Sequence, residues 1–403
     1  MKFRGWGCHG GRRIWPLVSA KLSAQARRRT GLSDFGAPAL EPALSTLTRS
    51  LEDEAGLHLL GRFLMRTHLR DLLQTRLQLT EAWRQDGIAG EAPPVERPVF
   101  IAGMPRSGST FLHELLAQDP DSRAPRVWEV MFPVAGRGDK EKDRRRRMRK
   151  AEFCLWWFRR LAPAADSVYP MRACTPHECV AIQSYTLMSE EFVTTCQIPS
   201  YEKFLRATDL RPTYLWERRF LQYLQAGCEP RRWTLKSPDH VYGLEALFSV
   251  FPDAVIIHTH RNPLHVLRSC TELTRVLRGL YARPAGVPEA LTLREAQELA
   301  EGAERAIRFR DEHPELAERF IDVRYSELVA DPLGTVAQIY QRMDAPFSAV
   351  AEERMRRLAS SRSRYEWHRR KHGLESLRLG ASAELTRFER YCSRFGLSRG
   401  ERV

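Results

Sequence analysis

The spacing of hydrophobic residues changes along the chain from a helical period to short apolar runs. Between Leu44 and Trp83, leucines recur every three or four residues, which predicts amphipathic helices. Later in the chain, helical spacing alternates with short apolar runs that have the length of buried strands: residues 97–103, 232–236, 254–260 and 320–325. Short strands that alternate with helices are typical of a parallel sheet covered on both faces. The pattern therefore predicts an α/β fold.

These patterns divide the chain into three parts. We expect residues 1–40 to be loosely ordered, residues 41–94 to form a helical N-terminal lead, and residues 95–403 to form the α/β domain. A helical insertion over about 138–227 separates the first two predicted strands and is too long for a simple crossover connection. We predict that this insertion forms a substrate-binding cap.

Composition and charge narrow the classes of function. The formal net charge is +14, so anionic partners are favoured. The basic run 144–150 has no interleaved aromatic residues, which favours a solvated helix face over a nucleic-acid site, and we expect no nucleic-acid partner. The eight cysteines are scattered without a CxxC pair, so we predict reduced thiols in a cytoplasmic protein and no metal site. No apolar stretch has the length of about 20 residues that crosses a bilayer.

The sharpest motif is GMPRSGST, residues 103–110, which connects a predicted strand to a predicted helix. Glycines allow a tight turn whose amides face an anion, and the helix N-terminus adds unpaired amides. The candidate phosphate ligands are Arg106, Ser107, Gly108, Ser109 and Thr110. Ser109 occupies the position where a nucleotide-kinase loop has its lysine, so a single phosphate fits this loop better than a triphosphate. The motif predicts that the parallel sheet is P-loop-like.

A second motif, HTHRNP at residues 258–263, again ends a predicted strand and begins a helix. Ser269 follows Arg261 by about two helical turns, which can direct an arginine and a hydroxyl toward one phosphate. A surface salt bridge of Arg261 is the alternative interpretation of this motif taken alone.

Together the two motifs resemble the family of sulfotransferases that use 3′-phosphoadenosine 5′-phosphosulfate (PAPS). The similarity includes TLKSPDH at 234–240 and VRYSELVADP at 323–332, and the N-terminal segments 30–36 and 44–83 resemble a bacterial branch. The resemblance implies that residues 103–110 bind the 5′-phosphosulfate and that Arg261 and Ser269 bind the 3′-phosphate. It implies sulfuryl transfer from PAPS to a hydroxyl or amine. The core pattern is shared with tyrosylprotein sulfotransferases.

In-line sulfuryl transfer needs a base for the acceptor proton and a cation for the departing oxygen. Lys236 is similar in position to the lysine of the tyrosylprotein branch and is the candidate cation, with Ser237 as a further phosphate ligand. Glu129 lies near the position of the family's catalytic glutamate, shifted by two residues, and an ion pair with a nearby arginine is the alternative role. His177, together with Glu178, is the rival base.

Fixed cations suffice for a sulfuryl group, so we expect no metal. The acceptor remains open among small-molecule, carbohydrate, lipid and peptide classes, although Trp156, Trp157, Phe158 and Tyr169 are candidates for an apolar acceptor pocket. The sequence indicates no oligomeric state. Two other functions remain as alternatives: a nucleotide or small-molecule kinase, and a non-catalytic protein that binds anions or nucleic acid.

Overall fold

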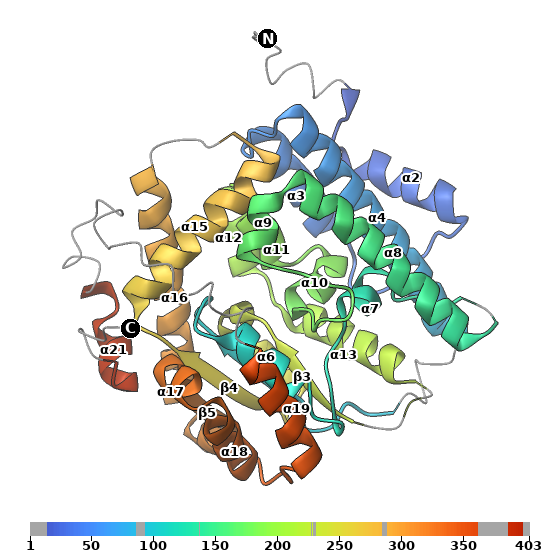
Figure 1. Ribbon diagram of the computed structural model, residues 1–403. Helices are drawn as coiled ribbons and strands as arrows, with labels where there is room; N and C mark the ends of the chain where they lie inside the picture. Colours follow the sequence, from blue (N-terminus) through green and yellow to red (C-terminus); the bar gives the residue numbers. More distant parts are fainter. Residues whose placement is uncertain are drawn as a thin grey trace.

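The computed structural model describes residues 14–85, 93–136, 138–226, 228, 231–283, 288–361 and 386–397. Its centre is a parallel sheet in which five strands lie in the order β2-β3-β1-β4-β5 (Figure 1). The strands are β1 Val99–Gly103, β2 Ser122–Arg123, β3 Arg232–Lys236, β4 Val255–His260 and β5 Phe320–Arg324. The predicted α/β class and all four predicted strands are confirmed. The two-residue edge strand β2 has no apolar run and was not predicted.

The register of the sheet determines where the site forms. Ile101 of β1 lies opposite Lys236 of β3, and Gly103 lies opposite Thr259 of β4. The carboxyl ends of the three central strands therefore meet at one edge, where ligands of open α/β sheets usually bind. The three strands are followed by the loop 104–108, by Lys236 and by Arg261.

Helices cover both faces of the sheet. One face packs against α6 Ser109–Leu116, α18 Pro332–Arg342 and α19 Ala349–Ser360, whose leucine, valine and methionine side chains are buried with those of β1, β4 and β5. The other face packs against α13 Arg211–Gln225 and α14 Leu244–Val250. The remaining elements of this half are η2 Pro238–Tyr242, α15 Pro263–Tyr281, α16 Pro288–Glu312, η3 Pro314–Arg319, α17 Tyr325–Ala330 and α21 Glu389–Phe395.

The N-terminal lead consists of α2 Ser19–Thr30, α3 Glu41–Asp53 and α4 Leu59–Gln85. The expectation that residues 1–40 are loosely ordered is wrong for α2, which packs on α4 and buries Leu22 and Ala26 completely. The helix was missed because its few apolar positions lie among polar residues. Residues 1–13 lie outside the described part of the chain.

The chain that leads from α2 to α3 is held by Arg76 of α4. The Arg76 guanidinium is completely buried and donates to four backbone carbonyls, those of Phe35, Gly36, Pro38 and Tyr185. Burial lowers the pKa of this group to about 9.

The helical insertion lies between β2 and β3 and follows the predicted range closely. Its elements are α8 Lys140–Leu161, α9 Pro163–Val168, α10 Cys179–Gln183, η1 Ser184–Thr186, α11 Glu190–Thr195, α12 Pro199–Ala207 and α13, preceded by α7 Val127–Met131. The basic run 144–150 belongs to α8, as expected for a helix face. Among the described residues, no helix is long and apolar enough to span a membrane.

Candidate active site

The loop between β1 and α6 has the backbone geometry that its glycines predict. Gly103 has φ 129°, and a Cβ atom there would lie 2.4 Å from the Thr259 carbonyl oxygen, so only glycine fits beside β4. Gly108 has φ 89°, and a Cβ atom there would lie 3.0 Å from the Tyr325 ring. Arg106 also has a positive φ, 64°. Three residues in this conformation turn the chain sharply into α6, whose first amides have no partner within the helix.

The side chains of this loop divide into two groups. The Ser107 hydroxyl is completely buried, donates to the Met104 carbonyl at 2.5 Å and lies 2.6 Å from the Thr259 hydroxyl. Ser107 therefore braces the loop from within. Arg106, Gly108, Ser109 and Thr110 line a large cavity.

The two predicted phosphate motifs meet in the structure. Arg106 Nε donates to the Ser269 hydroxyl at 2.9 Å, and Arg261 Nη1 donates to the Arg106 carbonyl at 2.8 Å. The Arg261 guanidinium stacks on the Tyr325 ring at 3.9 Å. Burial lowers the pKa of both arginines, and Arg106 lowers that of Arg261 further. Two close guanidinium groups that repel one another favour a bound dianion, which would relieve the repulsion.

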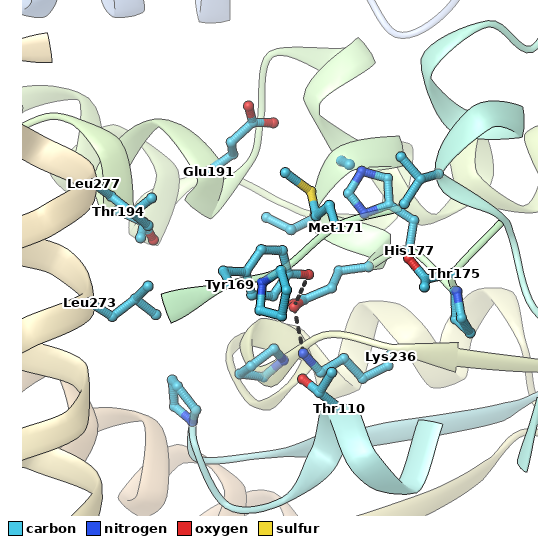
Figure 2. A pocket seen from close by; sticks show the side chains of 18 of the residues that line it. Thr110, Tyr169, Met171, Thr175, His177, Glu191, Thr194, Lys236, Leu273 and Leu277 are labelled. Atoms are coloured by element: carbon cyan, nitrogen blue, oxygen red, sulfur yellow. Dashed lines mark hydrogen bonds and ion pairs between the residues drawn. The ribbon is translucent and has the colours of Figure 1, made fainter. Parts of the chain in front are cut away.

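Lys236, at the end of β3, is buried and forms an ion pair with Glu178, with 2.5 Å between Nζ and Oε1. The Tyr169 hydroxyl donates to the same carboxylate oxygen at 2.6 Å. Figure 2 shows both side chains converging on this oxygen. Burial on its own would raise the pKa of Glu178, but Lys236 and Tyr169 outweigh it and hold the pKa below its usual value. The carboxylate is therefore ionised.

Glu129, the first candidate base, does not lie with Lys236 and Glu178 in the cavity. One of its oxygens accepts from Arg123 Nη2 at 3.0 Å, and the other accepts from the Arg126 backbone N–H at 2.9 Å, closing the first turn of α7. Among the described residues that line the cavity, Glu129 is absent. The geometry matches the ion pair that was the alternative role of this residue.

His177 lines the cavity but is not part of the Lys236 group of contacts. Its backbone N–H donates to the Pro125 carbonyl at 2.7 Å, which fixes the segment beside α7. Burial lowers the pKa of the ring, and within the described residues Nδ1 has no hydrogen-bond partner. A neutral ring at the wall of the cavity, whose Nδ1 is buried without a partner among the described residues, keeps His177 as the second candidate base.

Ser237 is next to Lys236, yet its hydroxyl has a local role. It accepts from the Asp239 backbone N–H at 3.4 Å and so caps η2. His240, in the same helix η2, is buried, and its Nδ1 lies 2.9 Å from the Tyr214 hydroxyl. The prediction that Ser237 contacts phosphate therefore has less geometric support than the prediction for Arg106.

A family model described as the sulfotransferase family matches residues 98–349. The chain belongs to the sulfotransferase family. It is 28% identical to sulfotransferase STF1 of Mycobacterium tuberculosis, whose crystal structure superposes with a TM-score of 0.79 over 92% of this chain and 97% of that chain. The crystal structure of STF9 of Mycobacterium avium is 25% identical, with a TM-score of 0.80 over 96% of this chain and 98% of that chain.

A curated relative is the omega-hydroxy-beta-dihydromenaquinone-9 sulfotransferase Stf3, found in Mycobacterium bovis and Mycobacterium tuberculosis. It is 27% identical over 267 residues, which span 61% of this chain and 62% of the relative. The match therefore covers less than two thirds of the relative's length.

In this sulfotransferase the cavity extends from the phosphate loop far into the helical insertion. Its volume is about 1680 Å³. The walls from α8 and α15 are mostly apolar, whereas α4 contributes Leu64 and Leu72 beside polar side chains. Trp157, Phe158 and Tyr169 line it as expected, whereas Trp156 does not appear among the described lining residues. Leu273 and Leu277 of α15 form part of the opposite wall (Figure 2).

Three site residues have roles that the sequence did not indicate. Tyr325 supports Arg261, Tyr169 holds Glu178, and Asp239 lines the cavity near Lys236. Burial, and secondly Glu178, raise the pKa of Asp239 to about 6. Of these three roles, only that of Tyr325 had a signal in the sequence, because Tyr325 directly follows a predicted strand whose end lies beside the phosphate loop.

Proposed function

We propose that this member of the sulfotransferase family transfers a sulfuryl group from PAPS to a hydroxyl group of a long apolar acceptor. The observation that carries the proposal is the position of Lys236 and Glu178. Both line one cavity, which is also lined by residues of the phosphate loop and by apolar side chains of α8 and α15. The cation Lys236, the carboxylate of Glu178, the phosphate loop and the space for an acceptor therefore lie together at the carboxyl edge of the sheet.

The residues present fit the donor. The backbone of the loop 104–108, together with Ser109 and Thr110 at the start of α6, would hold the 5′-phosphosulfate. Arg106, Arg261 and Ser269 form the connected cationic group that would hold the 3′-phosphate. When bound, PAPS supplies the sulfuryl group and a phosphate as leaving group.

Glu178 is the base in this proposal, and Lys236 is the cation for the leaving oxygen. In the free protein Lys236 keeps the pKa of Glu178 low, which makes the carboxylate a weak base. If the ammonium turns toward a bound phosphate, burial becomes the dominant influence, and the pKa of Glu178 rises. The acceptor hydroxyl then meets a carboxylate better suited to taking its proton.

The acceptor class follows from the cavity and from the relatives. The walls contributed by α8 and α15 are largely apolar, which favours a hydrocarbon chain over a sugar or peptide. The curated relative Stf3 is named for a hydroxylated menaquinone, a molecule of this kind. The similarity to Stf3 and the apolar walls together support a hydroxylated isoprenoid or a long-chain alcohol as the acceptor.

Calorimetric titration with adenosine 3′,5′-bisphosphate (PAP) tests the donor assignment. PAP should bind far more tightly than ATP or adenosine 5′-phosphate, and Arg261→Ala should weaken it by about 100-fold, since a charged phosphate contact is lost. Equal affinity for PAP and adenosine 5′-phosphate would refute the donor assignment. Magnesium-dependent ATP consumption would instead support a kinase.

A further inference from the structure

One face of α8 is unusual for a protein surface. Residues at helical spacing place a single stripe on the outside of this helix: Arg146, Arg149, Lys150, Phe153, Trp156, Trp157, Arg160 and Leu161. Every member of the stripe is exposed, and the buried Ala151 and Leu155 lie on the opposite side. The stripe contains four cations, three aromatic rings and one aliphatic residue, and no carboxylate.

The aromatic part of the stripe is a cluster rather than isolated side chains. Phe153, Trp156 and Trp157 are 60%, 45% and 48% exposed, and Leu161 is 52% exposed. The ring centroids of Trp156 and Trp157 are 4.9 Å apart, and that of Phe153 is 6.5 Å from Trp156. Large apolar groups gathered on a surface mark a binding site more often than chance exposure does.

This cluster is continuous with the cavity. Phe153, Trp157 and Leu161 are about half exposed and also line the cavity, so the cavity reaches the surface at the C-terminal half of α8. On the facing helix, Leu64 of α4 lines the same cavity, and its neighbour Phe63 is exposed together with Leu59 and Leu60. The mouth is therefore bordered by exposed apolar side chains of α8, and α4 has exposed apolar side chains next to its lining residue Leu64.

We propose that the stripe on α8 docks on the surface of a membrane that contains anionic phospholipids, so that the mouth of the cavity opens toward the acyl chains. Tryptophan is favoured at the interface between lipid and water, and arginine and lysine pair with anionic headgroups. A helix that lies in the interface and presents basic, aromatic and aliphatic residues to it is a recurrent form of membrane attachment. From Arg146 to Leu161 the stripe extends about 23 Å along the helix axis.

The charges on α8 favour an anionic membrane over a second copy of this chain or a nucleic acid as the partner. Arg149 and Arg160 are exposed on the same face as the tryptophans, whereas Arg144 and Arg145 at the start of the helix form ion pairs with Glu141. A second copy of this chain would place the cations of the two stripes against one another, which is unfavourable. A nucleic acid would leave the exposed aliphatic side chain of Leu161 without a partner.

This inference deepens the proposed function, because it depends on an apolar acceptor that enters the cavity from a membrane. Vesicle flotation tests it without reference to activity. The full chain should float with vesicles of phosphatidylcholine and phosphatidylglycerol in a 7:3 ratio, and much less with phosphatidylcholine alone. Raising the salt concentration to about 0.5 M should weaken binding, since it screens the headgroup charge.

A triple variant removes the stripe without touching the cavity lining: Trp156→Ser, Arg149→Gln and Arg160→Gln. Each cation near an anionic surface contributes about a fivefold gain in partitioning, so the two charges account for about 25-fold, and loss of the tryptophan adds to it. The matched control on α19 also loses two cations and one exposed apolar side chain: Val350→Ser, Arg354→Gln and Arg357→Gln. The control should float like the wild type.

Two results would overturn the proposal. One is equal flotation of the α8 variant and the wild type. The other is a dimer in sedimentation velocity that the α8 variant abolishes, which would assign the stripe to a second copy. PAP titration of the same variants separates the two proposals: normal PAP affinity with lost flotation confirms membrane docking through α8, and normal flotation with no PAP binding would refute only the proposed function.

Discussion

Replacing Glu178 with glutamine tests the proposed base, because glutamine keeps the shape of the side chain and loses its ability to take a proton. If Glu178 accepts the acceptor proton, kcat should fall by about 10²- to 10⁴-fold, the usual contribution of a positioned general base. PAP should bind at least as tightly as before, since the change removes a negative charge from a site that holds an anion.

The cost in stability follows from the contacts of the carboxylate. Glu178 pairs with Lys236 at 2.5 Å and accepts from Tyr169 at 2.6 Å, and the Lys236 side chain is only 4% exposed. Leaving a buried charge without its partner costs about 3–5 kcal/mol. The glutamine oxygen still accepts hydrogen bonds, so we expect a loss of unfolding free energy below this range, about 2–3 kcal/mol.

Glu129→Gln is the matched control. Glu129 also pairs with an arginine, Arg123, at 3.0 Å and accepts from a backbone N–H at 2.9 Å. Its loss should cost about 1–2 kcal/mol of stability, but kcat should stay within about threefold of the wild type, because its oxygens do not reach the cavity. A loss of activity caused by destabilisation alone would appear in both variants.

Turnover is measured with radiolabelled PAPS and a long-chain alcohol, and unfolding is measured in urea. The pH profile adds a second readout. The pKa of Glu178 lies below its ordinary value of 4.5 in the free protein. The kcat/KM of the wild type should therefore fall only below pH 4.5, where Glu178 becomes protonated and no longer acts as a base. The residual activity of Glu178→Gln should show no such acid limb. Full activity of Glu178→Gln would sink the assignment, and His177→Asn would be the next variant.

Two further predictions concern the surroundings of the site. Burial raises the pKa of Glu217 to about 7 from its ordinary 4.5, so the unfolded chain releases this proton first and stability falls as the pH rises between these values. Glu217→Gln should therefore stabilise the protein by about 1–3 kcal/mol at pH 8 and not at pH 4, as measured by urea unfolding. Gly103→Ala places a Cβ atom 2.4 Å from the Thr259 carbonyl oxygen, so it should weaken PAP binding by more than about tenfold and lower the unfolding free energy by about 2–4 kcal/mol; unchanged PAP titrations would contradict this account of the loop.

The donor half of the site was predictable because its signals are local. The loop 103–110 follows directly on a strand with an unbroken apolar run, and its positive φ angles occur at glycines and at the arginine between them. Arg261 follows β4 in the same way. Parallel strands bring such residues to one edge whatever the rest of the chain does.

The base was less predictable because it depends on the fold of the insertion. Glu129 was placed by its distance along the sequence from the phosphate loop, but a short helix turns its carboxylate toward Arg123. Glu178 reaches Lys236 only because the segment after α9 returns along α7, where His177 bonds to Pro125. No periodicity in the sequence encodes a contact made through such a return.

The ion pair between Lys236 and Glu178 connects the two halves of the site. Neither group is suited to its proposed role while the two are paired, because the ammonium is neutralised and the carboxylate is held as a weak base. A bound donor offers Lys236 a second anion, and burial then raises the proton affinity of Glu178. The carboxylate would thus become a competent base only after the donor has bound, so that proton transfer waits until the sulfuryl group is in place. Glu178 lines the same cavity as Phe153, Trp157 and Leu161 of α8, so an apolar acceptor that enters at α8 would share one cavity with this carboxylate.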